Sequence, residues 1–131
     1  MSSSTYHYAR TVDLPMSEAE PRVRETLREQ GFGVLTEIDI QATLKAKLDV
    51  DVRPYKILGA CNPSAAHRAL QAEPLIGTML PCNVVLRDAG DGQTEVAAVD
   101  PVASMTAVDN LALGEIAAEI RDRLRLAIDH V

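Results

Sequence analysis

Residues 55–83 read YKILGACNPSAAHRALQAEPLIGTMLPCN, and this stretch decides the fold because it joins a strand to a helix and then to a second strand. Residues 55–61 are apolar on both faces, which is typical of a central strand. Asn62 is a good helix N-cap, because its side-chain oxygen can accept hydrogen bonds from free backbone N–H groups, and Pro63 suits the first helical position. The pattern predicts a strand at 55–61 and a helix at 63–73.

The sequence before this stretch predicts four further elements. Residues 5–13 alternate between two faces and predict a strand. Ser17 and Glu20 have the spacing of a capping box, which would open a helix over residues 17–30 that Gly31 ends. Residues 32–39 are rich in strand formers and predict a second strand. Apolar residues at helical spacing predict a short helix over 40–48.

The sequence after this stretch predicts a hairpin and a long helix. CNVVLR at 82–87 and QTEVAAVD at 93–100 flank DAGDG, which is typical of a hairpin turn. We expect residues 74–81 to be irregular. Thr106 and Asp109 are the candidate caps of the last helix. Its core-facing stripe comprises Leu113, Ile116, Ala117, Ile120, Leu124, Ala127, Ile128 and Val131.

The order of these elements predicts the fold class. We expect one α+β domain over residues 1–131, in the order β-α-β-β-β-β-α, with an antiparallel sheet of about five strands. The two longer helices would lie on one sheet face, with short helices inserted between strands. A parallel βαβ arrangement of the centre is the alternative. One helical layer cannot also cover Leu35, Leu58 and Val99, so we expect a homodimer to cover the other face.

Composition narrows the classes of partner and compartment. The 131 residues are 47% hydrophobic and 24% charged, typical of a soluble domain, and the net charge of −6 repels nucleic acid phosphates. The sequence contains no apolar run long enough to span a membrane and no signal peptide pattern, so we expect a cytoplasmic protein without a membrane partner. Two cysteines in such a chain are expected to be reduced thiols.

The two cysteines are the leading candidates for a site. Cys61 precedes a helix N-terminus, where the positive end of the helix dipole lowers a thiol pKa and favours a nucleophile or ligand. In an antiparallel sheet, Cys61 at the end of one strand lies beside Cys82 at the start of the next. In a parallel sheet the two would lie at opposite ends. The alternative role of both cysteines is packing in the core.

Three polar residues complete the candidate ligand-binding site. The side chain of His67 leans toward the helix N-terminus and Cys61, so Cys61, His67 and Cys82 are candidate ligands of a soft metal. Asn62 and Asn83 directly follow the two cysteines. The alternatives are a solvated His67, a capping Asn62 and a strand-end hydrogen bond for Asn83.

A second polar group lies on the neighbouring strands. Glu37 and Asp39 share one strand face, and Lys56 would lie across from them. This arrangement suits either acid/base chemistry or a surface ion pair, and the ion pair is the commoner outcome.

Four phrases resemble a known family: GFGVLTEID at 31–39, YKILGACNP at 55–63, HRALQAEP at 67–74 and MLPCNV at 79–84. Over nearly its whole length the sequence closely resembles the family of domains of unknown function numbered 302. The resemblance implies an α+β fold like that of the TATA-binding protein's repeats, with an antiparallel sheet and a tendency to dimerise. It implies no activity, and the shared fold does not imply DNA binding.

Three classes of function follow from the sequence. The first is a dimeric module that binds a small ligand or soft metal near Cys61, Cys82 and His67. The second is a thiol-dependent redox or sulfur-transfer enzyme that uses Cys61 as its catalytic residue. The third is a structural or interaction subunit without small-molecule chemistry. The sequence indicates no particular cofactor.

Overall fold

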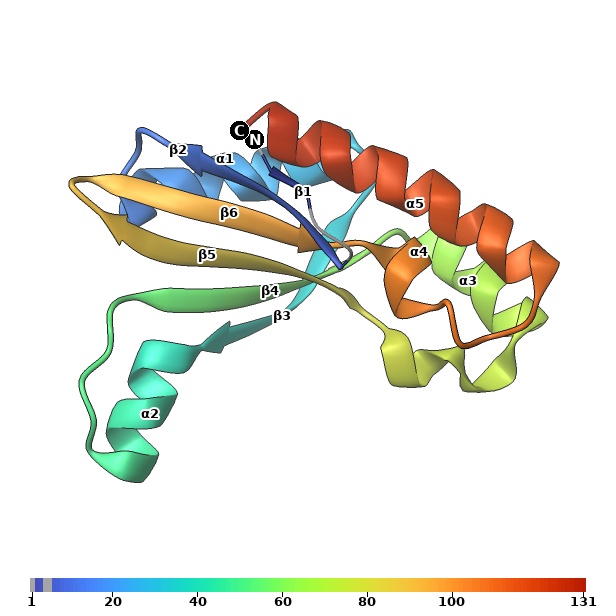
Figure 1. The fold of residues 1–131 in the computed structure, drawn as a ribbon, viewed down its shortest axis with the longest axis horizontal. Coiled ribbons are helices and arrows are strands. Elements are labelled where there is room, and N and C mark those ends of the chain that lie inside the picture. Colours follow the sequence, from blue (N-terminus) through green and yellow to red (C-terminus); the bar gives the residue numbers. More distant parts are fainter. Residues whose placement is uncertain (1, 4–5) are drawn as a thin grey trace.

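An antiparallel sheet organises the chain (Figure 1). The computed structural model describes residues 2–3 and 6–131. The strands are β1 (Ser2–Ser3), β2 (His7–Val12), β3 (Gly33–Asp39), β4 (Tyr55–Cys61), β5 (Cys82–Gly90) and β6 (Gln93–Val99). Their spatial order is β1-β2-β6-β5-β4-β3, and each neighbouring pair is antiparallel. The predicted α+β fold and element order are confirmed, and the parallel alternative is wrong.

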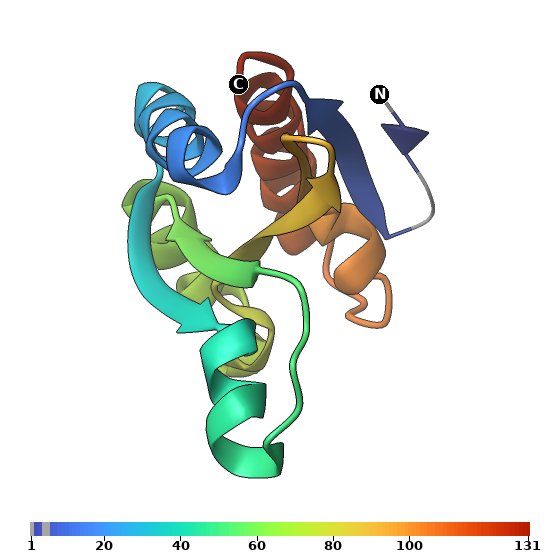
Figure 2. The same ribbon diagram turned by 90° about the vertical axis from the view of Figure 1, so that its left-hand side faces the viewer.

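Helices connect and cover the strands. They are α1 (Met16–Glu29), α2 (Ile40–Leu48), α3 (Pro63–Ala72), the 3-10 helix η1 (Pro74–Met79), α4 (Pro101–Ser104) and α5 (Leu111–Asp129). The two long helices, α1 and α5, lie on the same face of the sheet, whereas α2 projects away on the other side (Figures 1 and 2). None of the helices in the described residues is long and apolar enough to cross a bilayer.

The core forms between one face of the sheet and the apolar faces of the helices that cover it. Alternate residues of neighbouring strands, such as Leu58 opposite Val84, point toward α1 and α5 and are fully buried. Leu27 of α1 and Ile128 of α5 meet them from above. The residues between them in the strands point to the opposite, uncovered face, as with Val85.

Helix starts differ from their predicted positions in two places. Pro15, not Ser17, occupies the N-cap of α1, and its oxygen accepts from the N–H groups of Glu18 and Ala19. Asn110 caps α5, and its side-chain oxygen accepts from Leu113 N at 3.3 Å, so the predicted Thr106 and Asp109 caps are wrong. In both cases the helix begins directly after its cap and before the first buried residue of its stripe, which is Ala19 in α1 and Leu113 in α5. The short helix α4 and the 3-10 helix η1 were not predicted, and residue 5 of the first predicted strand lies outside the described residues.

Replacing Leu124 with Ala tests the packing of α5. Leu124 is 1% exposed, so Leu124→Ala removes buried methyl groups and should lower the free energy of unfolding by about 2–5 kcal/mol. Leu126→Ala is the matched control on the same helix, because Leu126 is 44% exposed, and its loss should be well under half as large. Urea unfolding measures both. Equal losses for the two variants would show that the stripe does not form the core.

Candidate functional site

The ends of two neighbouring strands bring the predicted cysteines together. Ala60, next to Cys61 at the end of β4, pairs with Cys82 at the start of β5. Asn62 follows and caps α3, with its Oδ1 accepting from Ala65 N at 3.1 Å. The strand, cap and helix of this junction therefore form as the local sequence predicts.

Two side chains closely approach Gly59 at this junction. A Cβ atom built on Gly59 would lie 2.6 Å from Cγ of Pro81 and would also overlap the side chain of Thr36. Only glycine therefore fits at this point of β4. Pro81 directly precedes Cys82, the first residue of β5, so this contact lies at the start of that strand.

Cys61 and Cys82 line one small cavity of about 40 Å³. It lies among the ends of β4 and β5, helix α3, the segment before β5, helix α4 and the N-terminal half of α5. Its lining residues are apolar apart from the amide of Asn62. Five of the lining residues are alanines, whose short side chains leave the space open. The lining residues are Phe32, Ala60, Cys61, Asn62, Ala65, Ala66, Ala69, Leu80, Pro81, Cys82, Pro101, Met105, Leu113, Ile116, Ala117 and Ile120.

Burial governs the protonation of both thiols. It raises the pKa of Cys61, which is the opposite of the lowering that its place before a helix predicts. Burial raises the pKa of Cys82 to about 11, and the neighbouring Cys61 adds to the shift. Near neutral pH both residues are thiols, which are poor nucleophiles compared with thiolates.

The other two predicted site residues lie elsewhere. Asn83 is exposed and lines a different hollow, on the uncovered face of the sheet, because successive strand residues point to opposite faces. His67 is exposed on α3, because Ala65 and Ala69 are its buried residues and a helix turns by 100° per residue. The structure thus joins Cys61, Asn62 and Cys82 only. In the described residues, no group of three His, Cys, Asp or Glu side chains is placed to hold a metal ion.

The charged residues near Lys56 form an ion-pair cluster. Lys56 Nζ lies 2.7 Å from Glu20 Oε1 and 2.6 Å from Glu37 Oε1, and Arg24 bridges the same two carboxylates at 3.1 and 3.4 Å. The hydrogen bonds that Lys56 donates to Glu20 and Glu37 raise the pKa of Lys56, and the bond to Glu37 lowers the pKa of Glu37. Asp39 instead caps α2 by accepting from Ala42 N. Both shifts favour the charged forms of Lys56 and Glu37, which suits an ion pair rather than acid/base chemistry.

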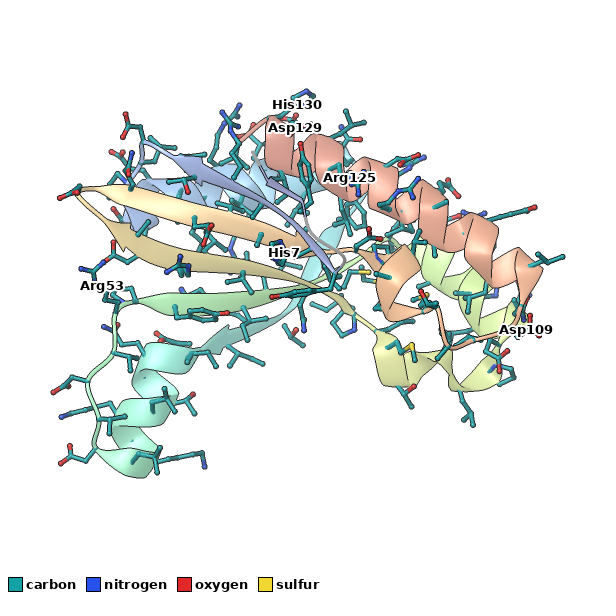
Figure 3. All side chains as sticks on the ribbon, viewed as in Figure 1. His7, Arg53, Asp109, Arg125, Asp129 and His130 are labelled. Atoms are coloured by element: carbon teal, nitrogen blue, oxygen red, sulfur yellow. The ribbon has the colours of Figure 1, made fainter. Side chains whose placement is uncertain are left out.

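A polar cluster that the sequence did not predict lies at the end of α5, where Figure 3 shows Arg125, Asp129 and His130. Tyr8 Oη donates to Asp129 Oδ1 at 2.6 Å, and this bond is the main cause of the raised pKa of Tyr8. Arg10 donates to the backbone oxygens of Asp129 and Val131 at 2.8 and 2.9 Å. Arg125 lies 5.3 Å from the centre of the Tyr8 ring. These contacts join β2 to α5 across more than a hundred residues, so no local pattern could predict them.

Thiol labelling tests the state of the two cysteines. In the native protein at pH 7 we expect slow alkylation by iodoacetamide, with Cys61 faster than Cys82 because Cys61 is only half-buried. The rate at each cysteine should rise with pH as its thiolate forms. The variants Cys61→Ser and Cys82→Ser show which alkylation rate belongs to which cysteine. Alkylation of native Cys61 as fast as that of the unfolded chain at pH 7 would contradict this.

The raised pKa of Cys82 also predicts a loss of stability in alkali. An unfolded thiol ionises near ~8.5, whereas native Cys82 keeps its proton until about pH 11. The unfolded state therefore loses the proton first, and stability that is complete below ~8.5 should fall by about 1–3 kcal/mol as the pH rises toward 11. Urea unfolding from pH 7 to 10.5 measures the fall. The variant Cys82→Ala should lose less stability over this pH range. Identical curves of stability against pH for the wild type and the variant would show that Cys82 does not cause the fall.

The comparisons with known proteins agree with this fold. The family described as Domain of unknown function DUF302 matches residues 8–131. The chain is also similar to the crystal structure of the uncharacterized conserved protein DUF302 from Bacillus stearothermophilus, with 34% identity, coverage of 97% of this chain and 98% of that chain, and a TM-score of 0.88. No curated protein matches. In sequence and in fold, this chain belongs to the DUF302 family.

Proposed function

We propose that the protein is a binding module for a very small apolar ligand, held in the cavity beside Cys61 and Cys82. The observation that carries the proposal is a recess whose lining is apolar apart from the amide of Asn62 and the thiols of Cys61 and Cys82, which burial keeps protonated. The amide oxygen of Asn62 is already engaged by Ala65 N. A bound water needs two to four polar partners, so this lining favours an apolar guest over water.

The size of the cavity limits the ligand. One water-sized group occupies ~10–15 Å³ on the same scale, so about 40 Å³ holds a guest of only a few non-hydrogen atoms. The thiols add polarizable sulfur to the wall and act as weak hydrogen-bond donors, which suits a small polarizable molecule. Larger ligands would need the segment 74–81 or the start of α5 to move away.

The other proposed functions have weaker support. A thiol-dependent enzyme requires a thiolate at Cys61, and burial favours the thiol. A soft metal such as copper(I) could use Cys61 and Cys82 as a two-sulfur pair, but it would have to displace both protons, and exposed His67 adds no third ligand there. A purely structural subunit leaves the cavity without a role.

Xenon is the probe that tests the binding proposal, because it is apolar, polarizable and small. In methyl-detected NMR, xenon should cause saturable shifts at Leu113, Ile116 and Ile120, which line the cavity. Ala117→Val should fill the space and reduce the xenon affinity at least tenfold. Ala118→Val is the matched control, since Ala118 is the next residue of α5 and lies outside the lining, and it should bind like the wild type.

Two outcomes would contradict the binding proposal. One is a wild-type protein whose cavity methyl groups do not respond to xenon. The other is equal xenon binding by the wild type and Ala117→Val. If Ala117→Val fails to fold, Ala66→Val fills the same cavity from α3 at a less buried position.

A further inference from the structure

We propose that one end of the molecule, formed by residues 69–80 and 105–116, binds a cationic amphipathic helix of another protein. This end is called the acidic tip below. It comprises the last residues of α3, all of η1, the segment between α4 and α5, and the first residues of α5. The acidic tip lies beyond the strand ends, on the far side of the molecule from the turn between β5 and β6 (Figure 1).

Two exposed leucines form the apolar part of the acidic tip. Leu111 is 90% exposed and Leu75 is 78% exposed, which makes them the most exposed large hydrophobic side chains in the described residues. The side chain of Asn110 brings them together, because its Nδ2 donates to Ala72 O at 2.9 Å and to Glu73 Oε1 at 3.4 Å. The chain just before Leu111 therefore contacts the chain just before Leu75. Neighbouring exposed leucines are typical of an interaction surface, whereas single ones are not.

The charge around these leucines has one sign. The acidic tip contains three carboxylates and neither Lys nor Arg, a charge of −3, which is half of the −6 of the whole chain. The carboxylates belong to Glu73, Asp109 and Glu115. Glu115 lies one helical turn after Leu111 on the same face of α5. Asp109 is exposed at the far end of the molecule (Figure 3). An apolar centre with an acidic border is complementary to an apolar surface with a basic border.

The nearest basic side chain does not neutralise the acidic tip. Arg68 directly precedes these residues in α3, and its Nη2 lies 2.8 Å from Glu119 Oε2. Its charge is thus already balanced by a carboxylate outside the acidic tip. A lysine or arginine from a partner can therefore meet Asp109 and Glu115 without competing with a cation of this chain at those positions.

The backbone of the acidic tip favours a helix as the partner. Residues 69–80 and 105–116 are all described, and none of them belongs to a strand. An extended peptide therefore finds no strand edge there with which to form backbone hydrogen bonds. A helix satisfies its own backbone groups and binds through side chains alone, with apolar anchors at positions i, i+3, i+4 and i+7.

Charge also argues against two other partners. A second copy of this chain carries the same acidic tip and a net charge of −6, so a contact between two tips brings like charges together. The surface of an anionic membrane repels the acidic tip for the same reason. A basic helix of another protein is the partner that satisfies both the apolar and the charged part of this surface. The proposal is independent of the cavity, because neither Leu75 nor Leu111 lines it.

A synthetic peptide tests the proposal by calorimetric titration of the full chain. The probe is a helical peptide with leucines at i, i+3, i+4 and i+7 on one face and lysines beside them. One control peptide has the same composition in an order that gives no apolar face, and a second has Glu in place of each Lys. The probe should bind at least tenfold more tightly than either control. Added salt should weaken its binding, because salt screens exposed charges.

Leucine substitutions locate the binding surface. Leu75→Ser and Leu111→Ser should each weaken probe binding at least fivefold, and both side chains are exposed enough for the fold to tolerate the change. Leu48→Ser is the matched control, because Leu48 is 66% exposed on α2 and lies outside the acidic tip. This control should bind the probe like the wild type.

Charge substitutions separate the acidic tip from the general negative charge of the protein. The double variant Asp109→Asn/Glu115→Gln should weaken probe binding at least tenfold. Glu25→Gln/Glu29→Gln is the matched control, because it removes the same charge from exposed positions of α1 and leaves the acidic tip unchanged. Equal weakening by the two double variants would show that the probe responds only to net charge, and would overturn the proposal.

Several other outcomes would overturn the proposal. They are the absence of probe binding, equal binding of the probe and the scrambled peptide, and probe binding unaffected by Leu75→Ser and Leu111→Ser. Binding to neutral phosphatidylcholine vesicles that depends on Leu75 would identify a membrane as the partner instead. Self-association in sedimentation velocity that Leu111→Ser abolishes would identify a second copy. If a variant fails to fold, methyl NMR of the wild type decides: the probe must shift the methyl signals of Leu75 and Leu111, and unchanged signals count against the proposal.

Discussion

The packing of α1 and α5 against one face of the sheet is the interaction on which the rest of this structure depends. Val23, Leu27, Leu58, Val84 and Ile128 meet there and are fully buried. Burial of each such side chain stabilises the fold by about 1.5–3 kcal/mol, which is a sizeable share of the net stability of a small domain. Polar contacts from β2 then hold the end of α5 in place. The fold is consequently one-sided, with all of its long helices on a single face.

The cavity follows from the length of α5. Its C-terminal half covers the sheet, and its N-terminal half continues past the strand ends to lie over α3 and α4 (Figure 1). A second apolar cluster forms there, around Ala69, Ile76 and Leu113. Alanine side chains at the junction of the two clusters leave a small space, and Cys61 and Cys82 lie in its wall. The thiols therefore share the low polarity of a core, which explains why burial raises their pKa values.

The opposite face of the sheet shows the other consequence of one-sided packing. Its strands present small and β-branched residues without a helical layer from the same chain, and the α2 connection extends on that side (Figure 2). Figure 3 labels His7, the first residue of β2, and Arg53, which lies beside the start of β4.

Local patterns determined the element order, the strand at 55–61, the Asn62 cap and the stripe of α5, because each depends on residues a few positions apart. The hairpin turn signal favoured the antiparallel sheet that places Cys61 and Cys82 together. Tertiary structure alone decided the starts of α1 and α5, the direction of the thiol pKa shifts and the separation of His67 and Asn83 from the cysteines. It also created the cavity, since Met105 and Ala117 line the same space as Cys61 only when α5 folds back over the strand ends. Solvation and enclosure depend on atoms far apart in the chain, which local sequence cannot specify.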